Sequence, residues 1–443
     1  MASSSHERRK WGELETYIQS QMQAYAIPGA SIAVSKNNQL IYSQGFGYRD
    51  IDQKLPVTED TIFGVASITK SFTALVIMQM HDQKQLSIDD PVVQYLPQFS
   101  LRGGNTDKVT ISHLLSHTTG VPPLRRCVQL DGFDEHLDYL RNGDYEPFAE
   151  PGEYFSYCND TFLLLGAIIE KVSGQSYRSY VTEKLLKPLG LTRSTYDVDR
   201  LIHLENVSTL YVYNKEKNHQ EAVAWPKLGN YEVGGGIRST AIDLITYGRL
   251  YTDPSFRKAR FPISERVLKN MWCPLIEATY VSSYGYALQI VSNYEGKTLV
   301  GHGGSQPGVS SHFGFIPEED MVVVVLLNCS DAPADDLWRA VANVTLDLPL
   351  EQSLAEETEY SMKEQEQKRL LGVYFVREGN TEAQITEESG RLYITIDGRK
   401  LELRTKDATT LVIEETGKPL TFYLLNNGTA WGVRIGLRMY LRK

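Results

Sequence analysis

Cysteine is scarce in this chain of 443 residues. Its four cysteines, Cys127, Cys158, Cys273 and Cys329, are widely spaced, and none forms a C-x-x-C pair. A disulfide framework or a zinc ribbon needs closely paired cysteines, so this spacing argues against both and favours reduced, buried thiols. The segment Met1–Lys10 has no hydrophobic core of the kind that directs secretion. Together these features predict a cytoplasmic protein.

Long apolar runs and an excess of positive charge are also missing. No stretch approaches the roughly 18 uninterrupted apolar residues of a membrane helix. The 45 basic residues are outnumbered by 55 acidic ones, which gives a net charge of −10. Because a duplex-binding protein needs a basic stripe to neutralise phosphates, we expect no nucleic-acid partner and no membrane span.

The order of the expected elements indicates an α+β fold. Strands are predicted near both ends of the first 340 residues, with helices between them. The expected strands include 30–34, 40–42 and 322–327, and the expected helices include 11–26, 66–81 and 161–173. The nearly all-Val and Leu run at 322–327 is typical of a strand covered on both faces. This arrangement predicts a sheet built from both ends of the domain and a mainly helical subdomain inserted between them.

Composition changes at about residue 350. Residues 351–369 are polar and charge-rich, which predicts a linker or an exposed helix. Beyond Leu370 the pattern becomes short alternating strands separated by turn residues, at 392–396, 400–404, 410–414, 420–424 and 430–435. Such a pattern predicts an antiparallel meander or small barrel. We therefore expect a first domain over 1–350, a linker over 351–369 and a barrel over 370–443.

Ser67 and Lys70 are the first chemically suggestive residues. Residues three apart on a helix share a face, so their Oγ and Nζ atoms can come within hydrogen-bond reach. A serine hydroxyl needs an adjacent base to act as a nucleophile, and lysine is such a base only when burial and positive neighbours lower its pKa. The alternative is a helix N-cap followed by a solvated lysine, because S-x-x-K occurs by chance in many chains.

Tyr157 and Asn159 precede the expected helix at 161–173. A phenol can serve as a base or proton relay when nearby lysines depress its pKa. An asparagine two residues further on points to the same side of an extended segment, and its amide can bind a substrate carbonyl. The alternative is a packed aromatic followed by a helix cap.

His302, Gly303, Gly304 and Ser305 follow a segment, 297–300, that is predicted to be a strand. Glycines in a strand allow a ligand or another backbone to approach closely. A strand edge that lines a cleft can also pair with an extended substrate and offer a backbone N–H to an oxyanion. The alternative is a histidine at a tight turn.

In this order and at these separations, the three motifs resemble those of the serine β-lactamase and penicillin-binding protein superfamily. The nearest branch holds class C β-lactamases, D-alanyl-D-alanine carboxypeptidases, D-aminopeptidases and related esterases. Four longer stretches strengthen the resemblance, at 63–74, 109–120, 150–153 and 234–244. It covers about residues 15–345 and implies an antiparallel sheet flanked by helices beside an all-helical subdomain, with a cleft between. The strands after Leu370 resemble the lipocalin-like β-barrel of some members, which could cap the cleft or mediate oligomerisation.

The resemblance also implies roles for the motif residues. Ser67 would be the acylated nucleophile, with Lys70 as its partner base and Tyr157 as a proton shuttle; which of these two is the acylation base stays open. Asn159 would hold the substrate amide. The backbone N–H groups of Ser67 and Ser305 would form the oxyanion hole. No cofactor is implied.

The third motif, in which His302, Gly303, Gly304 and Ser305 would contact substrate, departs from the family. Many members have Lys-Thr-Gly there, whereas a histidine with its ordinary pKa is mostly neutral at pH 7. This weakens the hold on a substrate carboxylate and argues against an efficient β-lactamase. We predict a serine hydrolase of small-molecule or peptide substrates, either a peptidase or amidase with D-amino-acid preference or a carboxylesterase. The alternatives are a β-lactamase and a catalytically silent member that binds cell-wall peptides.

His113 and His117 lie four residues apart, the spacing of some zinc sites. No third acidic or cysteine ligand accompanies them, so we expect a role in helix packing and no metal site. The sequence leaves the oligomeric state open, a homo-oligomer included.

Overall fold

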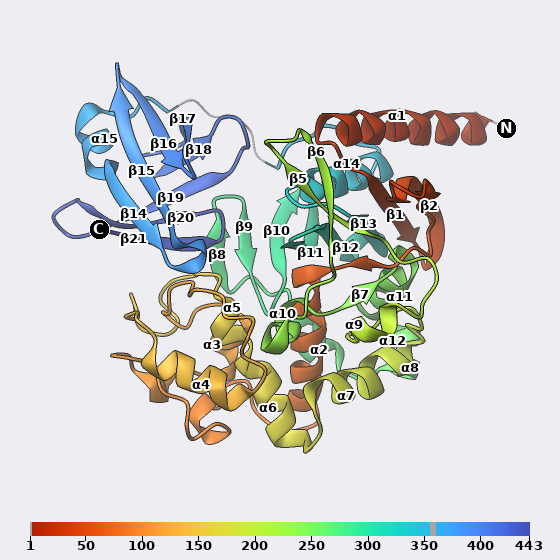
Figure 1. The fold of residues 1–443 in the computed structure, drawn as a ribbon, viewed down its shortest axis with the longest axis horizontal. Coiled ribbons are helices and arrows are strands. Elements are labelled where there is room, and N and C mark those ends of the chain that lie inside the picture. Colours follow the sequence, from red (N-terminus) through yellow and green to blue (C-terminus); the bar gives the residue numbers. More distant parts are fainter. Residues whose placement is uncertain (1, 355–359) are drawn as a thin grey trace.

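The computed structural model describes residues 2–354 and 360–443. Its centre is a nine-stranded antiparallel sheet (Figure 1). In sheet order the strands are β3 (Leu55–Pro56), β2 (Gln39–Asp50), β1 (Gly29–Lys36), β13 (Met321–Leu327), β12 (Val309–Ile316), β11 (Lys297–Gln306), β10 (Gln289–Tyr294), β9 (Ser282–Tyr284) and β8 (Ile276–Thr279). The N- and C-terminal parts of the domain therefore meet in one sheet, as the sequence predicts.

The strand β13 lies at the middle of this sheet because it is apolar on both faces. It pairs with β1 on one side and β12 on the other, and all seven of its residues are buried. Val322 and Val324 pack into the core on one face of the sheet, whereas Val323 and Val325 pack into the core on the opposite face. This is the burial expected for alternating side chains of a strand covered on both sides.

Helices cover both faces of the sheet. On one face lie α1 (Ala2–Ala24) and α14 (Ala334–Thr345); on the other lie α2 (Thr69–Asp82), α11 (Ala241–Thr252), α12 (Pro254–Arg260) and α13 (Glu265–Asn270). Two short pairs of strands flank the sheet, β4 (Phe63–Gly64) with β7 (Arg238–Ser239) and β5 (Leu210–Asn214) with β6 (His219–Val223). No helix in the described part of the chain is long and apolar enough to cross a membrane.

The helical subdomain is inserted between the strands, as predicted. Its helices are α3 (Ile111–Leu115), α4 (Phe133–Asn142), α5 (Asn159–Phe162), α6 (Leu164–Ser173), α7 (Tyr177–Val181), α8 (Lys187–Leu189), α9 (Val198–Leu201) and α10 (Glu232–Gly235). The α6 helix ends at Gly174, whose φ of 69° is the left-handed conformation of a helix C-terminus. The predicted helix at 161–173 is in fact two helices, divided at Leu163.

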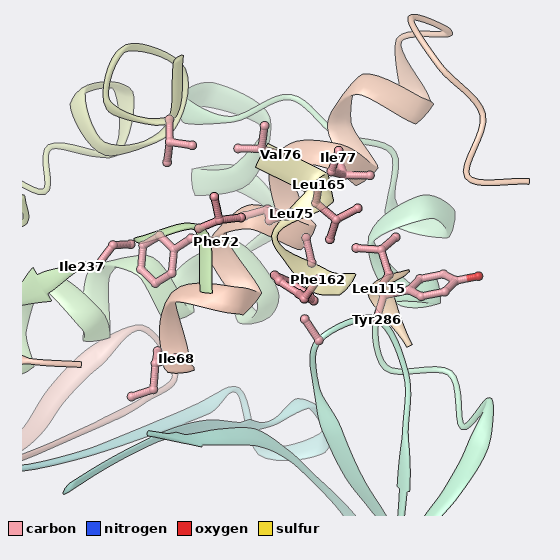
Figure 2. Packing of buried hydrophobic residues seen from close by; sticks show 14 of the residues in the cluster. Ile68, Phe72, Leu75, Val76, Ile77, Leu115, Phe162, Leu165, Ile237 and Tyr286 are labelled. Atoms are coloured by element: carbon pink, nitrogen blue, oxygen red, sulfur yellow. The ribbon is translucent and has the colours of Figure 1, made fainter. Parts of the chain in front are cut away.

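The central helix α2 joins the sheet to the helical subdomain. Twelve of its fourteen residues are buried, so the helix is enclosed by protein on every side. Figure 2 shows Phe72, Leu75 and Val76 of α2 packed with Phe162 and Leu165 of the helical subdomain. The helix α2, which begins two residues after Ser67, is therefore held rigidly on all sides.

The C-terminal segment forms a closed eight-stranded antiparallel barrel. It is preceded by α15 (Glu364–Leu370), and its strands are β14 (Gly372–Val376), β15 (Thr381–Glu388), β16 (Arg391–Ile396), β17 (Arg399–Thr405), β18 (Thr410–Ile413), β19 (Pro419–Leu424), β20 (Ala430–Ile435) and β21 (Arg438–Arg442). The predicted barrel is confirmed, although three of its strands were not among the expected ones. The interior is filled by apolar side chains, including Tyr374, Ile394 and Phe422.

The barrel lies against the sheet and the helical subdomain rather than apart from them (Figure 1). The buried Arg434 donates hydrogen bonds to the backbone carbonyl and the carboxylate of Glu277 on β8. Beside it, Tyr154 of the helical subdomain packs edge-on against Tyr423 and Trp431 of the barrel. Aromatic pairs of this kind and a partly buried ionic hydrogen bond give the contact a fixed geometry.

The prediction of buried thiols holds for only two of the four cysteines. Cys158 and Cys329 are buried, whereas Cys127 is partly exposed and Cys273 is exposed. All four are free. Spacing in the sequence excludes a disulfide framework, but the exposure of each thiol depends on the loop that carries it.

We predict that Phe72→Ala lowers the free energy of unfolding by about 3–5 kcal/mol, the usual cost of emptying a buried phenylalanine site. Phe72 is fully buried and stacks on Tyr247 with ring centroids 3.7 Å apart. Guanidinium denaturation followed by tryptophan fluorescence measures the change. The control Ile202→Ala, at a side chain that is 81% exposed, should stay within about 0.5 kcal/mol of wild type. A loss below about 1 kcal/mol for Phe72→Ala would contradict the proposed packing.

Candidate active site

Ser67 lies in a single 3₁₀ turn, Ala66–Ile68, directly before α2. The preceding Ala66 has a φ of 45°, a conformation that non-glycine residues rarely adopt. The turn is held against the sheet because the Ser311 hydroxyl of β12 donates to the Val65 carbonyl oxygen at 2.9 Å. Gly304 of β11 crosses so close that a Cβ atom there would collide with both groups. The glycine allows β11 to pass beside the nucleophile.

Lys70 comes to the same point from the first turn of α2. Its Nζ lies 3.3 Å from Ser67 Oγ and donates a hydrogen bond to the Gly234 carbonyl oxygen at 2.9 Å. The side chain is fully buried, and its Nζ lies about 5 Å from the Tyr157 ring centroid and at a similar distance from that of Phe162. The S-x-x-K pair is thus a buried contact, not a helix cap with a solvated lysine.

Burial lowers the pKa of Lys70 well below its usual range, because removing an ammonium group from water disfavours its charged form. The positive charges of Arg126 and Arg438 lower it further. Both effects favour the neutral amine, which is the form that accepts a proton from Ser67.

Tyr157 packs beside this pair and is also buried. Its backbone N–H donates to the carbonyl oxygen of Leu437 in the barrel, and its ring lies 4.1 Å from that of His117. Burial raises the pKa of the phenol, while the nearby Ser67 hydroxyl acts to lower it. Within the described residues, the Tyr157 hydroxyl makes no hydrogen bond of ordinary geometry. The phenol is therefore neutral and its oxygen is available for an incoming group.

His302 lies within β11, which continues through the third motif to Gln306 instead of ending in a turn. Its Nδ1 is 2.5 Å from the Gly303 carbonyl oxygen and its Nε2 is 2.9 Å from the Tyr284 hydroxyl. Burial, followed by the proximity of Lys70, lowers the pKa of His302 to about 3. The histidine is neutral at pH 7, as predicted, and supplies no cation.

Asn159 is at the first position of α5, close to Tyr157. Its Nδ2 donates to Glu378 of the barrel at 3.0 Å, and Glu378 also accepts a hydrogen bond from Nε of Arg438 at 2.7 Å. The Arg438 guanidinium carbon lies 4.9 Å from the Tyr157 ring centroid. Two side chains from the barrel thus contact the second motif directly: Glu378 contacts Asn159, and Arg438 contacts Tyr157.

A cavity of about 430 Å³ opens beside Ser67, Tyr157 and the third motif. It is lined by Ser67, Tyr157, His302, Gly303, Gly304, Ser305, Asp331, Asp335, Lys418, Leu437 and Arg438, among others. A larger hollow of about 550 Å³ lies beside α7 and α10, but none of the three motifs lines it. We therefore place the candidate site in the smaller cavity, between the sheet, the helical subdomain and the barrel.

The three motifs thus come together, and the structure adds residues that sequence reasoning missed. His117 is not on the helix with His113, because α3 ends at Leu115; it is buried against Tyr157, and its Nδ1 accepts from the Cys158 N–H. Burial lowers its pKa well below the usual range. Its position four residues from His113 gave no signal for this role.

Gly234 was noted only as part of a shared stretch, and the barrel residues Glu378 and Arg438 carried no motif at all. In the described part of the chain, no group of three or more histidine, cysteine, aspartate or glutamate side chains could hold a metal ion. The reactive groups that the site brings together are the serine, the lysine and the phenol.

We predict that Gly234→Ala slows acylation of Ser67 with little effect on stability. A Cβ atom at Gly234 would lie 2.7 Å from Lys70 Nζ, so the lysine would have to move from its present position. Displacing a reacting group by about 1 Å costs roughly 100-fold in rate. Labelling by a fluorophosphonate measures the effect. The matched control is Gly235→Ala, whose nearest neighbour would be Gln306 Oε1 at 3.7 Å, an ordinary contact. Equal labelling rates for the two variants would contradict the proposed position of Lys70.

Comparison with known proteins points to the same family that the sequence motifs resemble. A model of the beta-lactamase family matches residues 14–346. Penicillin-binding protein 4* of Bacillus subtilis (strain 168) is 26% identical over 444 residues, covering 94% of each chain. The solved structure of the octameric penicillin-binding protein homologue from Pyrococcus abyssi is 30% identical, with a TM-score of 0.72, and covers 98% of this chain and 99% of that one.

A class C β-lactamase solved in complex with cefoxitin is 24% identical with a TM-score of 0.65. That match covers 77% of this chain and 99% of the other, whereas the two penicillin-binding protein relatives match almost the whole chain. The likeness to the class C enzyme shows a common fold. With the family match spanning most of the hydrolase domain, the chain belongs to the β-lactamase family of serine hydrolases, which includes the penicillin-binding proteins.

Proposed function

We propose that this serine hydrolase is a penicillin-binding-protein-like peptidase or amidase that forms an acyl-enzyme on Ser67. The contact between Lys70 Nζ and Ser67 Oγ carries the proposal, because a buried amine with a lowered pKa is the base that a serine nucleophile needs. The matches to penicillin-binding proteins over almost the whole chain support the peptidase class. D-amino-acid preference and carboxylesterase activity stay predictions within this class, as does a homo-oligomeric state.

The geometry supports a two-step mechanism. Ser67 Oγ attacks the substrate carbonyl carbon as its proton passes to neutral Lys70, directly or through the Tyr157 hydroxyl, which gives its own proton to the lysine as it takes that of the serine; the carbonyl oxygen becomes an oxyanion. The backbone N–H groups of Ser67 and Ser305 are the proposed donors to that oxyanion. The bond to the leaving group breaks as the stored proton moves to it, which leaves an ester on Ser67. A water molecule, deprotonated by the same groups, then hydrolyses the ester and regenerates the serine.

The environment of His302 supports a peptidase over an efficient β-lactamase. The neutral histidine cannot provide the positive charge that lysine supplies at this position in many members. The cavity has a cation elsewhere, because Arg438 of the barrel lines it on the side of Tyr157. We therefore expect a substrate carboxylate to be held toward the barrel, by Arg438.

We predict that a fluorophosphonate or fluorescent penicillin labels the wild-type protein and does not label Ser67→Ala. Lys70→Arg should also lose labelling by about 100-fold or more, because a guanidinium has a pKa above about 12 and cannot act as the base. In-gel fluorescence measures both effects. Labelling of Ser67→Ala at the wild-type rate would overturn the assignment of the nucleophile. An unlabelled wild-type protein would favour the catalytically silent binder.

A substrate panel separates the remaining activities. We predict turnover of amino-acid amides or short peptides, with D-residues preferred over L-residues, and only slow turnover of nitrocefin. The same panel includes p-nitrophenyl esters and is run on wild type and Ser67→Ala. Nitrocefin hydrolysis with the catalytic efficiency of a dedicated β-lactamase would contradict the peptidase proposal, and turnover of esters alone would favour the carboxylesterase.

A further inference from the structure

Two hairpins of the barrel bring opposite charges into the proposed active site. Glu378 lies in the turn between β14 and β15, and Arg438 is the first residue of β21. In Figure 1 this side of the barrel, with β14 and β21, faces α5 and the helical subdomain. The Glu378 backbone N–H donates to the Pro123 carbonyl oxygen, and the Leu437 carbonyl accepts from the Tyr157 N–H. Backbone hydrogen bonds therefore fix both hairpins to the site.

The Glu378 carboxylate joins two groups of the site. One oxygen accepts from Asn159 Nδ2 at 3.0 Å and the other accepts from Arg438 Nε at 2.7 Å. The side chain is 24% exposed, and the adjacent Arg438 keeps its pKa below the usual range, so it is charged at neutral pH. A mostly buried carboxylate with a partner for each oxygen has a single well-defined position.

Few of the titratable groups around Lys70 carry charge near neutral pH. Burial keeps the two histidines, the phenol and the thiol that face it neutral, namely His117, His302, Tyr157 and Cys158. The charged groups acting on Lys70 are then Arg126, Arg438 and Glu378. The two arginines favour the neutral lysine, and Glu378 favours the ammonium form.

Asp160 is the remaining buried acid in this region. It follows Asn159 in α5 and accepts a hydrogen bond from the Tyr231 hydroxyl at 2.6 Å. Burial raises its pKa to about 7, so its titration can add a feature to any pH profile. The negative charge of Glu378 contributes to this raised pKa, so the Glu378 variants are compared with wild type in an Asp160→Asn background as well, where this feature is absent.

We propose that Glu378 is a positioning residue of the hydrolase site, whose carboxylate holds the Asn159 amide and Arg438 in place and offsets the positive charge of Arg438 beside the catalytic lysine. This inference rests on the proposed function, because it assigns Lys70 as the base. Under this proposal, two charged side chains of the barrel act on the active-site lysine. The barrel would then be required for normal catalysis even though the nucleophile and the base both come from the first domain.

Removing each charge of the pair should shift the acid limb of the pH–rate profile in opposite directions. Acylation needs neutral Lys70, so the midpoint of the acid limb follows the pKa of this lysine in the free enzyme. Glu378→Gln leaves the positive charge of Arg438 uncompensated, which lowers the lysine pKa and moves the limb to lower pH. Arg438→Gln leaves the negative charge of Glu378, which moves the limb to higher pH. We expect shifts of about 0.5–1 pH unit at an effective dielectric constant of about 20.

The experiment measures the rate of labelling by an uncharged fluorophosphonate against pH, using the full chain. An uncharged probe is chosen so that direct binding to Arg438 does not enter the result. The matched control is Glu402→Gln, which removes the same charge from the same barrel at an exposed ion pair with Arg391, and it should follow the wild-type profile. Opposite shifts support the proposal, because a general loosening of the barrel would move both variants the same way.

The conservative variant Glu378→Asp separates charge from position. It keeps the negative charge, but its shorter side chain cannot span from Asn159 to Arg438. We expect a near wild-type acid limb together with a KM for amide substrates raised about three-fold or more. If Glu378→Gln does not fold, Glu378→Asp and Arg438→Gln still test the proposal through the KM and the direction of the limb.

The two proposals fail in different ways. Unshifted limbs in both Glu378→Gln and Arg438→Gln, in a protein whose labelling is lost in Ser67→Ala, would overturn only the role of Glu378. So would shifts in the same direction. Labelling that survives in Ser67→Ala would overturn the proposed function, and the role of Glu378 would fall with it.

Discussion

The burial of Lys70 is the constraint on which the rest of the site depends. An ammonium group in water would hold its proton, whereas in this pocket desolvation and two arginines favour the neutral amine. The lysine is enclosed by the packing of α2, which is buried on nearly every side, and by the Gly234 carbonyl, which accepts a hydrogen bond from Nζ. Gly234 is small because any larger residue would occupy the space of the lysine. Packing of the helical core and activation of the serine are therefore consequences of the same arrangement.

The barrel forms part of the wall of the proposed active site. In the family fold, the cleft lies between the sheet and the helical subdomain, and here the barrel forms a third wall. Its hairpin at Leu437 is hydrogen-bonded to the backbone of Tyr157, and Glu378 is hydrogen-bonded to Asn159. The barrel interior is filled by side chains, so its contribution to the site comes from its loops. The cation absent from the third motif is found instead on the barrel, at Arg438.

Local patterns predicted much of the fold. The Val and Leu run at 322–327 predicted the buried strand β13, and the short alternating segments after Leu370 predicted five of the barrel strands. The strand β15 (Thr381–Glu388) was missed because only Ala383 and Ile385 in it are buried, so its apolar alternation is short and its remaining residues are polar. The exposure of Cys273 and the separation of His117 from the α3 helix were also missed, because both depend on where a helix ends.

The sequence by itself determined the chemical inventory of the site: a serine and a lysine one helical turn apart, a phenol before a helix, and glycines in a strand. Each of these features is encoded within a short segment of its own, where backbone periodicity decides which side chains share a face. Only the tertiary structure decided that Glu378 and Arg438 belong to the same site. They lie more than 200 residues from Tyr157, and the docking of one folded unit on another depends on surface shape and charge, which have no periodic signature in the chain.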